Sequence, residues 1–165
     1  MLIPDLYLSS IFEITPDTLK NMGIAALILD VDNTLREYRG KCPYDGVVEW
    51  IAKMREAGIK LIVASNNFSS SIQPFALTLD LNYVAMSLKP LPFGLRKALN
   101  KLNIDRNKVA VVGDQIFTDI FGGKLNGFKT ILVEPFVKEK GYFWKVKRFF
   151  EKPFIARYDK GDKKQ

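Results

Sequence analysis

The sequence predicts an α/β fold, a three-layer sandwich built on a mainly parallel sheet of five strands. Apolar segments of strand length alternate along the chain with segments of helical periodicity. The strand segments are almost continuously apolar, which is typical of parallel strands that are buried on both faces. Connections are short and no insertion is visible, so we expect one domain over residues 1–137 and a separate basic segment over 138–165.

The first half of the chain contains two strand and three helix signals. Thr15 is a good N-cap and Pro16 suits the first helical position, so a short helix is predicted at 15–23, before a buried strand at 25–30. A helix at 43–57 is indicated by apolar residues on one face and by Gly58 at its end. A second strand is predicted at 59–65. A helix from about residue 71 would keep Pro74 in its first turn, where proline is tolerated.

The second half repeats the alternation. In chain order, we predict a short strand at 82–86, a helix at 92–102, a strand at 108–114, a helix at 117–125 and a fifth strand at 128–135. The glycines of "FGGKLNG" are interpreted as close packing and a helix stop before that last strand.

The composition excludes several kinds of site. The chain has 165 residues and no histidine, which excludes histidine bases, Ser-His triads and histidine-ligated zinc. Its one cysteine, Cys42, cannot form an intrachain disulfide, which fits a reducing compartment. The N-terminus lacks the pattern of a signal peptide, and the apolar run at 24–29 is too short to span a bilayer. We therefore expect a cytoplasmic protein.

Carboxylates gather where the predicted strands end. Asp30 and Asp114 end two strands, and Asp32 follows Asp30 by two residues, so its side chain can face the same mouth. Asp119 lies nearby along the chain, although it could equally be a surface helix residue. Clustered carboxylates raise each other's pKa values unless a cation joins them, and oxygen ligands favour Mg²⁺.

Such a site suits phosphoryl transfer. A carboxylate can attack phosphorus to give an aspartyl-phosphate, and a second carboxylate can protonate the leaving group and then activate water. Ser65, Asn66 and Asn67 offer a hydroxyl and amides, and Lys89 offers a cation at the same edge. Ser65, Asn66 and Lys89 are therefore candidate phosphate-binding residues.

Four short motifs in this order resemble those of the haloacid dehalogenase superfamily. They are "DVDNT", Ser65 after an apolar strand, Lys89, and "GDQIFTD" at 113–119. The resemblance implies that Asp30 is the nucleophile and Asp32 the acid/base. It further implies that Ser65 and Lys89 hold the phosphoryl group, and that Asp30, the Asp32 backbone carbonyl and Asp114 bind Mg²⁺. Asp119 would be an accessory acid, either an indirect metal ligand or an orienter of Lys89.

The segments "SNN", "KPLP" and "VGDQIFTDIFGGKLNGFKTILVEP" are similar to the small YqeG-type branch of that superfamily. That branch includes a mitochondrial phosphatidylglycerophosphate phosphatase, so the resemblance implies a Rossmannoid domain without a cap and a role in phosphatidylglycerol biosynthesis. The spacing agrees, since 29 residues separate Leu35 from Ser65 and 23 separate Ser65 from Lys89. An open mouth could reach a lipid headgroup, although a soluble phosphoester or a phosphoprotein is an alternative substrate.

The C-terminal segment carries most of the net charge. Residues 138–165 hold ten Lys/Arg and four Asp/Glu, a net charge of +6 out of +7. Aromatic residues between 142 and 150 share one helical face. Two interpretations stay open: a helix docked on the domain, or an interfacial helix on an anionic membrane, at its inner face.

Two other classes of function deserve comparison. A phosphoaccepting receiver domain also carries aspartates and a lysine, but on other strands than those observed here. A nucleic-acid-binding module could use the basic segment, yet it would leave the carboxylates unexplained. The sequence does not indicate an oligomeric state. It therefore favours a Mg²⁺-dependent phosphomonoester hydrolase.

Overall fold

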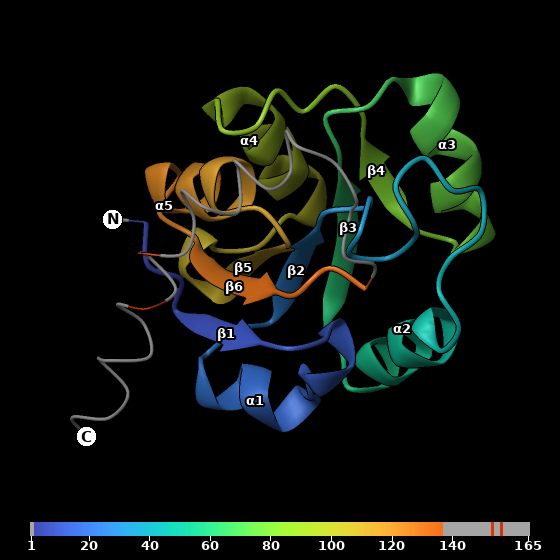
Figure 1. Ribbon diagram of the computed structural model, residues 1–165. Coiled ribbons are helices and arrows are strands. Elements are labelled where there is room, and N and C mark those ends of the chain that lie inside the picture. The colour runs from blue at the N-terminus through green and yellow to red at the C-terminus, as the bar shows by residue number, and fades with distance from the viewer. Residues whose placement is uncertain (1, 137–152, 154–155, 157–165) are drawn as a thin grey trace.

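The computed structural model describes residues 2–136, 153 and 156. It is a three-layer α/β sandwich whose sheet has six parallel strands in the order β1-β6-β5-β2-β3-β4 (Figure 1). The prediction of a parallel α/β sheet is confirmed. The expected basic segment at 138–165 lies outside the described residues, apart from Pro153 and Ala156.

The strands and helices alternate as the sequence predicted. The strands are β1 Leu6–Leu8, β2 Ala26–Leu29, β3 Lys60–Ala64, β4 Asn82–Val84, β5 Val109–Gly113 and β6 Lys129–Val133. The helices are α1 Pro16–Asn21, α2 Val47–Glu56, α3 Ser69–Thr78, α4 Pro92–Leu102 and α5 Phe121–Leu125. Short 3₁₀ turns lie at Ile11–Glu13 and Arg106–Lys108, and a π-helical turn, η3, lies at Ile116–Ile120.

The predicted count of five strands is wrong, because β1 adds a sixth at the edge of the sheet. It pairs with β6, so that Leu6 lies beside Ile131 and Leu8 beside Val133. β1 has three half-buried residues and no long apolar run, which gives it little signal in the sequence. Asp5 fixes its start, because its carboxylate accepts hydrogen bonds from the backbone N–H and hydroxyl of Thr130.

Three predicted helix boundaries also differ. The helix expected from residue 43 begins at Val47, because Tyr44 donates its N–H to Leu35 O and Gly46 adopts φ 89°. α3 begins at Ser69, so Pro74 lies inside the helix and not in its first turn. The helix expected at 117–125 is divided into the π-helical turn and α5.

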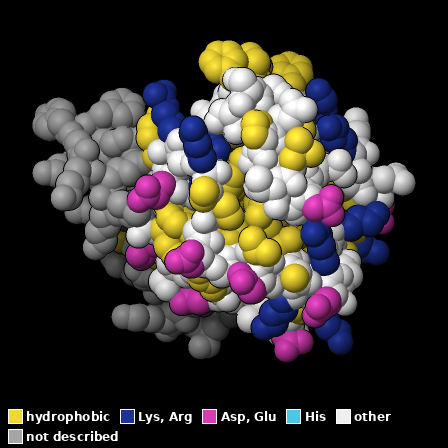
Figure 2. All heavy atoms as spheres, turned by 90° about the vertical axis from the view of Figure 1, so that its right-hand side faces the viewer, with side chains coloured by type: hydrophobic (Ala, Val, Ile, Leu, Met, Phe, Trp, Pro, Cys, Tyr) yellow, Lys and Arg dark blue, Asp and Glu magenta, His cyan; other side chains and the backbone are white. Residues whose placement is uncertain are grey.

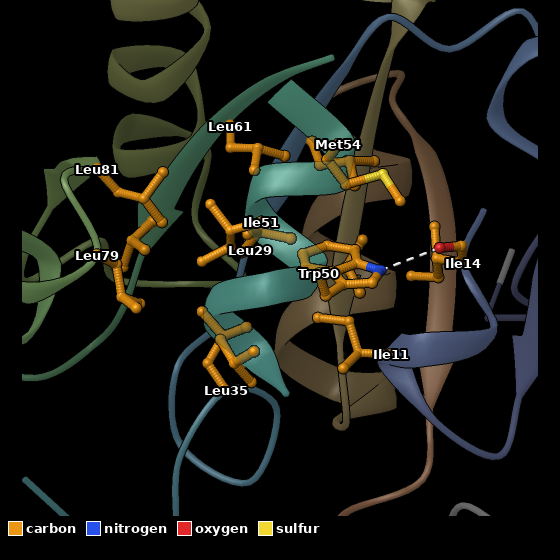
Figure 3. Packing of buried hydrophobic residues seen from close by; sticks show 14 of the residues in the cluster. Ile11, Ile14, Leu29, Leu35, Trp50, Ile51, Met54, Leu61, Leu79 and Leu81 are labelled. Atoms are coloured by element: carbon orange, nitrogen blue, oxygen red, sulfur yellow. Dashed lines mark hydrogen bonds between the residues drawn. The ribbon is translucent and has the colours of Figure 1, made fainter. Parts of the chain in front are cut away.

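Two large apolar cores, one on each face of the sheet, hold the layers together. α1, α2 and α3 pack on one face of the sheet, and α4 packs on the other against β2, β3 and β5. On the first face Trp50 of α2 inserts between the sheet and Ile14, whose carbonyl accepts the indole N–H at 3.0 Å (Figure 3). Burial of such aromatic and aliphatic side chains on both faces fixes the strand ends in space.

The described residues contain no extended cap. α2 is the helix between β2 and β3, and α3 is the one between β3 and β4. No helix in the described part of the chain has the length and hydropathy needed to cross a bilayer.

Candidate active site

The site lies at the carboxyl ends of β2, β3 and β5, which are neighbours at the middle of the sheet. Asp30, Ser65 and Asp114 each directly follow one of these strands, and all three are buried. Asp30 is held to β5 by its N–H, which donates to Val112 O at 2.9 Å. The parallel register therefore brings three residues from distant parts of the sequence to one edge.

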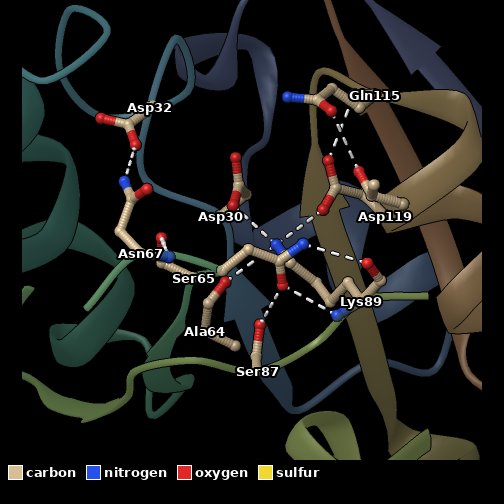
Figure 4. Close-up of polar contacts among 11 residues, drawn as sticks. Asp30, Asp32, Ala64, Ser65, Asn67, Ser87, Lys89, Gln115 and Asp119 are labelled. Carbon is tan, nitrogen blue, oxygen red and sulfur yellow. Dashed lines mark hydrogen bonds and ion pairs between the residues drawn. The ribbon is translucent and has the colours of Figure 1, made fainter. Parts of the chain in front are cut away.

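Lys89 lies at the centre of the polar contacts (Figure 4). Its Nζ is 2.6 Å from Asp30 Oδ1 and 2.7 Å from Asp119 Oδ1, and it donates to Ala64 O at 2.9 Å. The side chain is buried, and its three oxygen partners come from different elements. Burial alone would lower the pKa of Lys89, but the two carboxylates overcome this effect and raise it, so the ammonium stays charged.

Asp119 reaches this site through the π-helical turn at Ile116–Ile120. The turn directs its carboxylate back, so that Oδ2 accepts the N–H of Gln115 at 3.2 Å while Oδ1 contacts Lys89. The side chain is fully buried, which excludes the alternative of a surface residue. A Cβ on Gly113 would lie 2.3 Å from the Asp119 carboxylate, so only glycine fits at the end of β5.

Three carboxylates form an acidic cluster beside Lys89. One oxygen each from Asp30, Asp114 and Asp119 lies within 4.8 Å of the others. The pKa of Asp30 is raised to about 7, mainly because the carboxyl is buried. The charge of Lys89 opposes this rise, and the charges of Asp119 and Asp32 add to it.

The cluster has the donor set and charge that suit a divalent metal ion. Three carboxylates and one ammonium leave two excess negative charges among these four groups, which a divalent cation would neutralise. Hard carboxylate oxygens favour Mg²⁺, Mn²⁺ or Ca²⁺ over softer ions.

Asp32 lies at the same edge but outside this acidic cluster. Its Oδ1 accepts hydrogen bonds at 3.0 Å from Arg36 Nε and from the backbone N–H of Arg39, and its other oxygen accepts from Asn67 Nδ2. The turn that allows this has Asn33 at φ 63°, a conformation that asparagine tolerates. The second aspartate thus has its own set of donors, while its charge still acts on Asp30.

Arg36 is a site residue that the sequence reasoning missed. Its side chain is almost completely buried, its Nη2 donates to Ser71 Oγ at 3.0 Å, and its guanidinium lies 4.8 Å from the Phe75 ring centroid. It therefore connects Asp32 to α3. The position of Arg36, six residues after Asp30, does not predict its contact with Asp32, because that contact depends on the path of the loop.

Asn66 and Ser65 lie beside Lys89, but they make different contacts. Asn66 Oδ1 accepts from the Lys89 N–H at 2.8 Å and from Ser87 Oγ at 2.9 Å, and its Nδ2 donates to Lys89 O at 3.0 Å. The Asn66 amide thus fixes the backbone of the Lys89 loop. Ser65 Oγ accepts the N–H of Asn67 at 3.2 Å.

The comparisons with known proteins point to one family. Residues 7–127 match the model of haloacid dehalogenase-like hydrolases. Over 154 residues the chain is 32% identical to the probable phosphatase YqeG of Bacillus subtilis (strain 168), covering 93% of this chain and 90% of that protein.

Two further likenesses agree with this result. The chain is 28% identical over 124 residues to the pyrophosphatase PpaX of Halalkalibacterium halodurans, covering 70% of this chain and 55% of that one. The structure of a haloacid dehalogenase-like hydrolase from Brucella suis 1330 superposes with a TM-score of 0.59 at 10% identity, covering 72% of this chain and 88% of that one. At that identity the structural likeness supports the fold alone.

Proposed function

Because the chain belongs to the haloacid dehalogenase-like hydrolases and is a phosphatase of that family, we propose that it hydrolyses phosphomonoesters through an aspartyl-phosphate on Asp30. The observation that carries this proposal is the position of Asp30. It is a buried carboxylate at a strand end, next to a charged lysine and two further aspartates. A nucleophile needs such a cation nearby, because negative charge accumulates on the phosphoryl oxygens.

The proposed reaction has two steps. In the first, Asp30 Oδ attacks phosphorus, the P–O bond to the alcohol breaks, and Asp32 gives a proton to the leaving oxygen. In the second, Asp32 takes a proton from water, whose oxygen attacks phosphorus and releases phosphate and free Asp30. Hydrogen bonds from Arg36, Asn67 and the Arg39 N–H hold the Asp32 carboxylate in place for this proton transfer.

Lys89 and Ser65 are proposed to bind the phosphoryl group. The Lys89 ammonium lies between Asp30 and Asp119, where it can interact with phosphoryl oxygens as they approach Asp30. Asn66 supports this role by fixing the Lys89 loop, so we assign its side chain to positioning. Asp119 orients the ammonium.

Hydrolases of this family use a divalent metal, and we propose that this one uses Mg²⁺. Asp30, Asp114 and the backbone carbonyl of Asp32 would hold the ion, with Asp119 as an indirect partner. When bound, Mg²⁺ would neutralise phosphoryl oxygens and keep Asp30 ionised at neutral pH.

The proposed substrate is phosphatidylglycerophosphate. Two observations support it: the motifs resemble a branch that includes a phosphatidylglycerophosphate phosphatase, and the described residues contain no extended cap. A site without a cap can reach a headgroup that is fixed in a membrane. We further propose that residues 1–137 are a single cytoplasmic domain and that residues 138–165 bring it to the inner face of the membrane.

A phosphate-release screen tests these proposals. Purified protein is assayed with Mg²⁺ against phosphatidylglycerophosphate in mixed micelles, soluble phosphomonoesters and a phosphopeptide. We expect the lipid phosphate to give the highest kcat/KM and EDTA to abolish release. Equal or better turnover of a soluble ester would contradict the lipid substrate. Phosphate release without Mg²⁺ would contradict the proposal that the enzyme uses this metal.

A further inference from the structure

The loops that frame the candidate active site expose apolar side chains and bury polar ones. Met86 and Leu88 are each 52% exposed, while Ser87 and Lys89, which alternate with them along the chain, are almost completely buried. Soluble loops normally show the opposite pattern, since burying a lysine costs free energy unless it is paired. Lys89 is paired with two carboxylates, whereas Met86 and Leu88 each expose about half of their apolar surface.

These apolar side chains form one rim on two adjacent loops. The loop after β3 and the loop after β4 are joined by hydrogen bonds from Met86 N to Asn67 O and from Ser87 N to Ser65 O. We define the apolar rim by five exposed side chains on these loops and at the start of α4: Phe68, Met86, Leu88, Leu91 and Phe93. Phe68 and Phe93 are each 68% exposed, more than any other large hydrophobic residue in the described part of the chain.

Figure 2 shows the side of the molecule on which α3 and β4 lie. Hydrophobic side chains project at its upper end and gather across its middle, and both basic and acidic side chains lie around them. A contiguous group of exposed apolar side chains often marks a surface that contacts another protein or a membrane.

The positive charge on α4 beside the rim indicates what kind of partner the rim binds. No aspartate or glutamate occurs between Asp80 and Asp105, the stretch that carries four of the five rim residues. Arg96 and Lys97 are exposed on α4, one turn after Phe93. Apolar side chains beside cations are the combination that partitions into the interface of an anionic bilayer.

We propose that the apolar rim inserts into an anionic phospholipid bilayer and holds the mouth of the site at the level of the headgroups. This inference rests on the proposed function, because it explains how Lys89 and Asp30 would meet a phosphate displayed on a membrane. Phe68 precedes the first turn of α3 and Phe93 lies in the first turn of α4, so the rim is fixed to two helices that pack on the sheet.

The test compares full-length wild type with the double variant Phe68→Ser/Phe93→Ser. Serine is favourable at a helix N-terminus and adds no charge, so the variant should keep its fold. The control is Leu77→Ser, which removes a side chain of similar exposure, 65%, near the far end of α3. Vesicles of phosphatidylglycerol and phosphatidylcholine are sedimented with each protein, and hydrolysis of para-nitrophenyl phosphate is measured in parallel.

We expect the double variant to bind vesicles about tenfold or more weakly than wild type and the control to bind normally, with hydrolysis of the soluble ester unchanged in both. Equal vesicle binding by wild type and double variant would overturn the proposal. So would a concentration-dependent dimer that the double variant abolishes, because the rim would then contact a second copy. If wild type did not hydrolyse the soluble ester, that result would contradict the proposed function. The vesicle result would still decide, by itself, whether the apolar rim binds a membrane.

Discussion

At the scale of single residues, the arrangement around Lys89 determines what the site can do. One ammonium contacts two carboxylates and a backbone carbonyl, while a third carboxylate completes the acidic cluster. Like charges this close repel each other strongly in a buried site. Lys89 therefore allows the aspartates to coexist, and in the proposed function it would supply the positive charge that a phosphoryl group needs.

Replacing Lys89 by methionine should lower kcat by about 10²–10³, because it removes a preorganised cation from the reacting phosphoryl group. The matched control is Lys101→Met, since Lys101 Nζ also donates to a backbone carbonyl, that of Tyr83, but lies away from the acidic cluster. Steady-state hydrolysis at saturating Mg²⁺ measures the effect, and circular dichroism confirms the fold. A folded Lys89→Met protein with wild-type kcat would contradict the role of the lysine.

The sequence predicted the positions of the acidic residues well but not their contacts. Asp30 and Asp114 could be placed because each ends a clear apolar strand. Arg36 could not, because its contact with Asp32 depends on a loop whose path follows from the left-handed Asn33 and from the burial of Phe75. The hydrogen bonds between the Asn66 side chain and the Lys89 backbone could not be predicted either, because no local pattern signals them.

At the scale of elements, the π-helical turn after β5 and the end of β5 act together. The turn carries Asp119 towards Lys89, and Gly113 leaves the space that its carboxylate fills. A π turn is uncommon and is often found at functional sites. Its sequence reads as the start of an ordinary helix, which explains why the predicted helix at 117–125 merged two elements.

Gly113→Ala should displace the Asp119 carboxylate, weaken its contact with Lys89 and raise the Mg²⁺ concentration for half-maximal activity. We also expect a loss of stability of about 1–3 kcal/mol from overpacking. Gly123→Ala is the control, because its Cβ would clash with Thr130 at 2.6 Å, on the side of the sheet that α5 covers. It should lose stability with the same Mg²⁺ requirement, and equal Mg²⁺ titrations for both variants would disprove the specific role of Gly113.

The edge strand β1 gives a prediction about pH. Partial burial raises the pKa of Asp5, but hydrogen bonds from Lys124 and Thr130 overcome this and hold the pKa below its ordinary value. The ionised carboxylate therefore stabilises the fold above about pH 4, and this contribution is lost as the pH falls through the lowered pKa.

Asp5→Asn should thus reduce the free energy of unfolding by about 1–2 kcal/mol at pH 7, and the difference from wild type should shrink below about pH 4. Urea unfolding at a series of pH values measures it. Asp80→Asn serves as control, since the Asp80 side chain is 98% exposed and its ion pair with Arg55 spans 3.6 Å. A difference that stays constant down to pH 2 would show that the charge of Asp5 does not anchor β1.

At the scale of the whole molecule, the parallel sheet brings the ends of β2, β3 and β5 together and opens them on one side. The sequence predicted a parallel sheet but not the order β5-β2-β3 at its middle, because strand order depends on the crossover connections and not on local pattern. β1 was missed because three half-buried residues are too few for a periodic signal. The alternation of strands and helices was predicted correctly because each buried strand is a continuous apolar segment.

Mg²⁺ should stabilise the whole domain, because it relieves repulsion that the folded state creates among its buried carboxylates. At a concentration 100 times its Kd, a ligand of the folded state adds about 2.7 kcal/mol. We therefore expect the melting temperature to rise on adding Mg²⁺ and to fall again with EDTA, with a much smaller rise in Asp114→Asn. Equal Mg²⁺ shifts in wild type and Asp114→Asn would exclude Asp114 as a ligand.

The most direct test of the account is to identify the residue that carries phosphate during turnover. The variant Asp32→Asn is mixed with para-nitrophenyl phosphate, whose leaving group needs little protonation, so the first step proceeds and the second is slowed. The reaction is quenched in acid, the protein is digested, and the masses of its peptides are measured by mass spectrometry. We predict one phosphoryl group on the peptide that contains Asp30, and none when Asp30→Asn is added. A phosphoryl group on another residue, or none despite continuing phosphate release, would contradict Asp30 as the nucleophile.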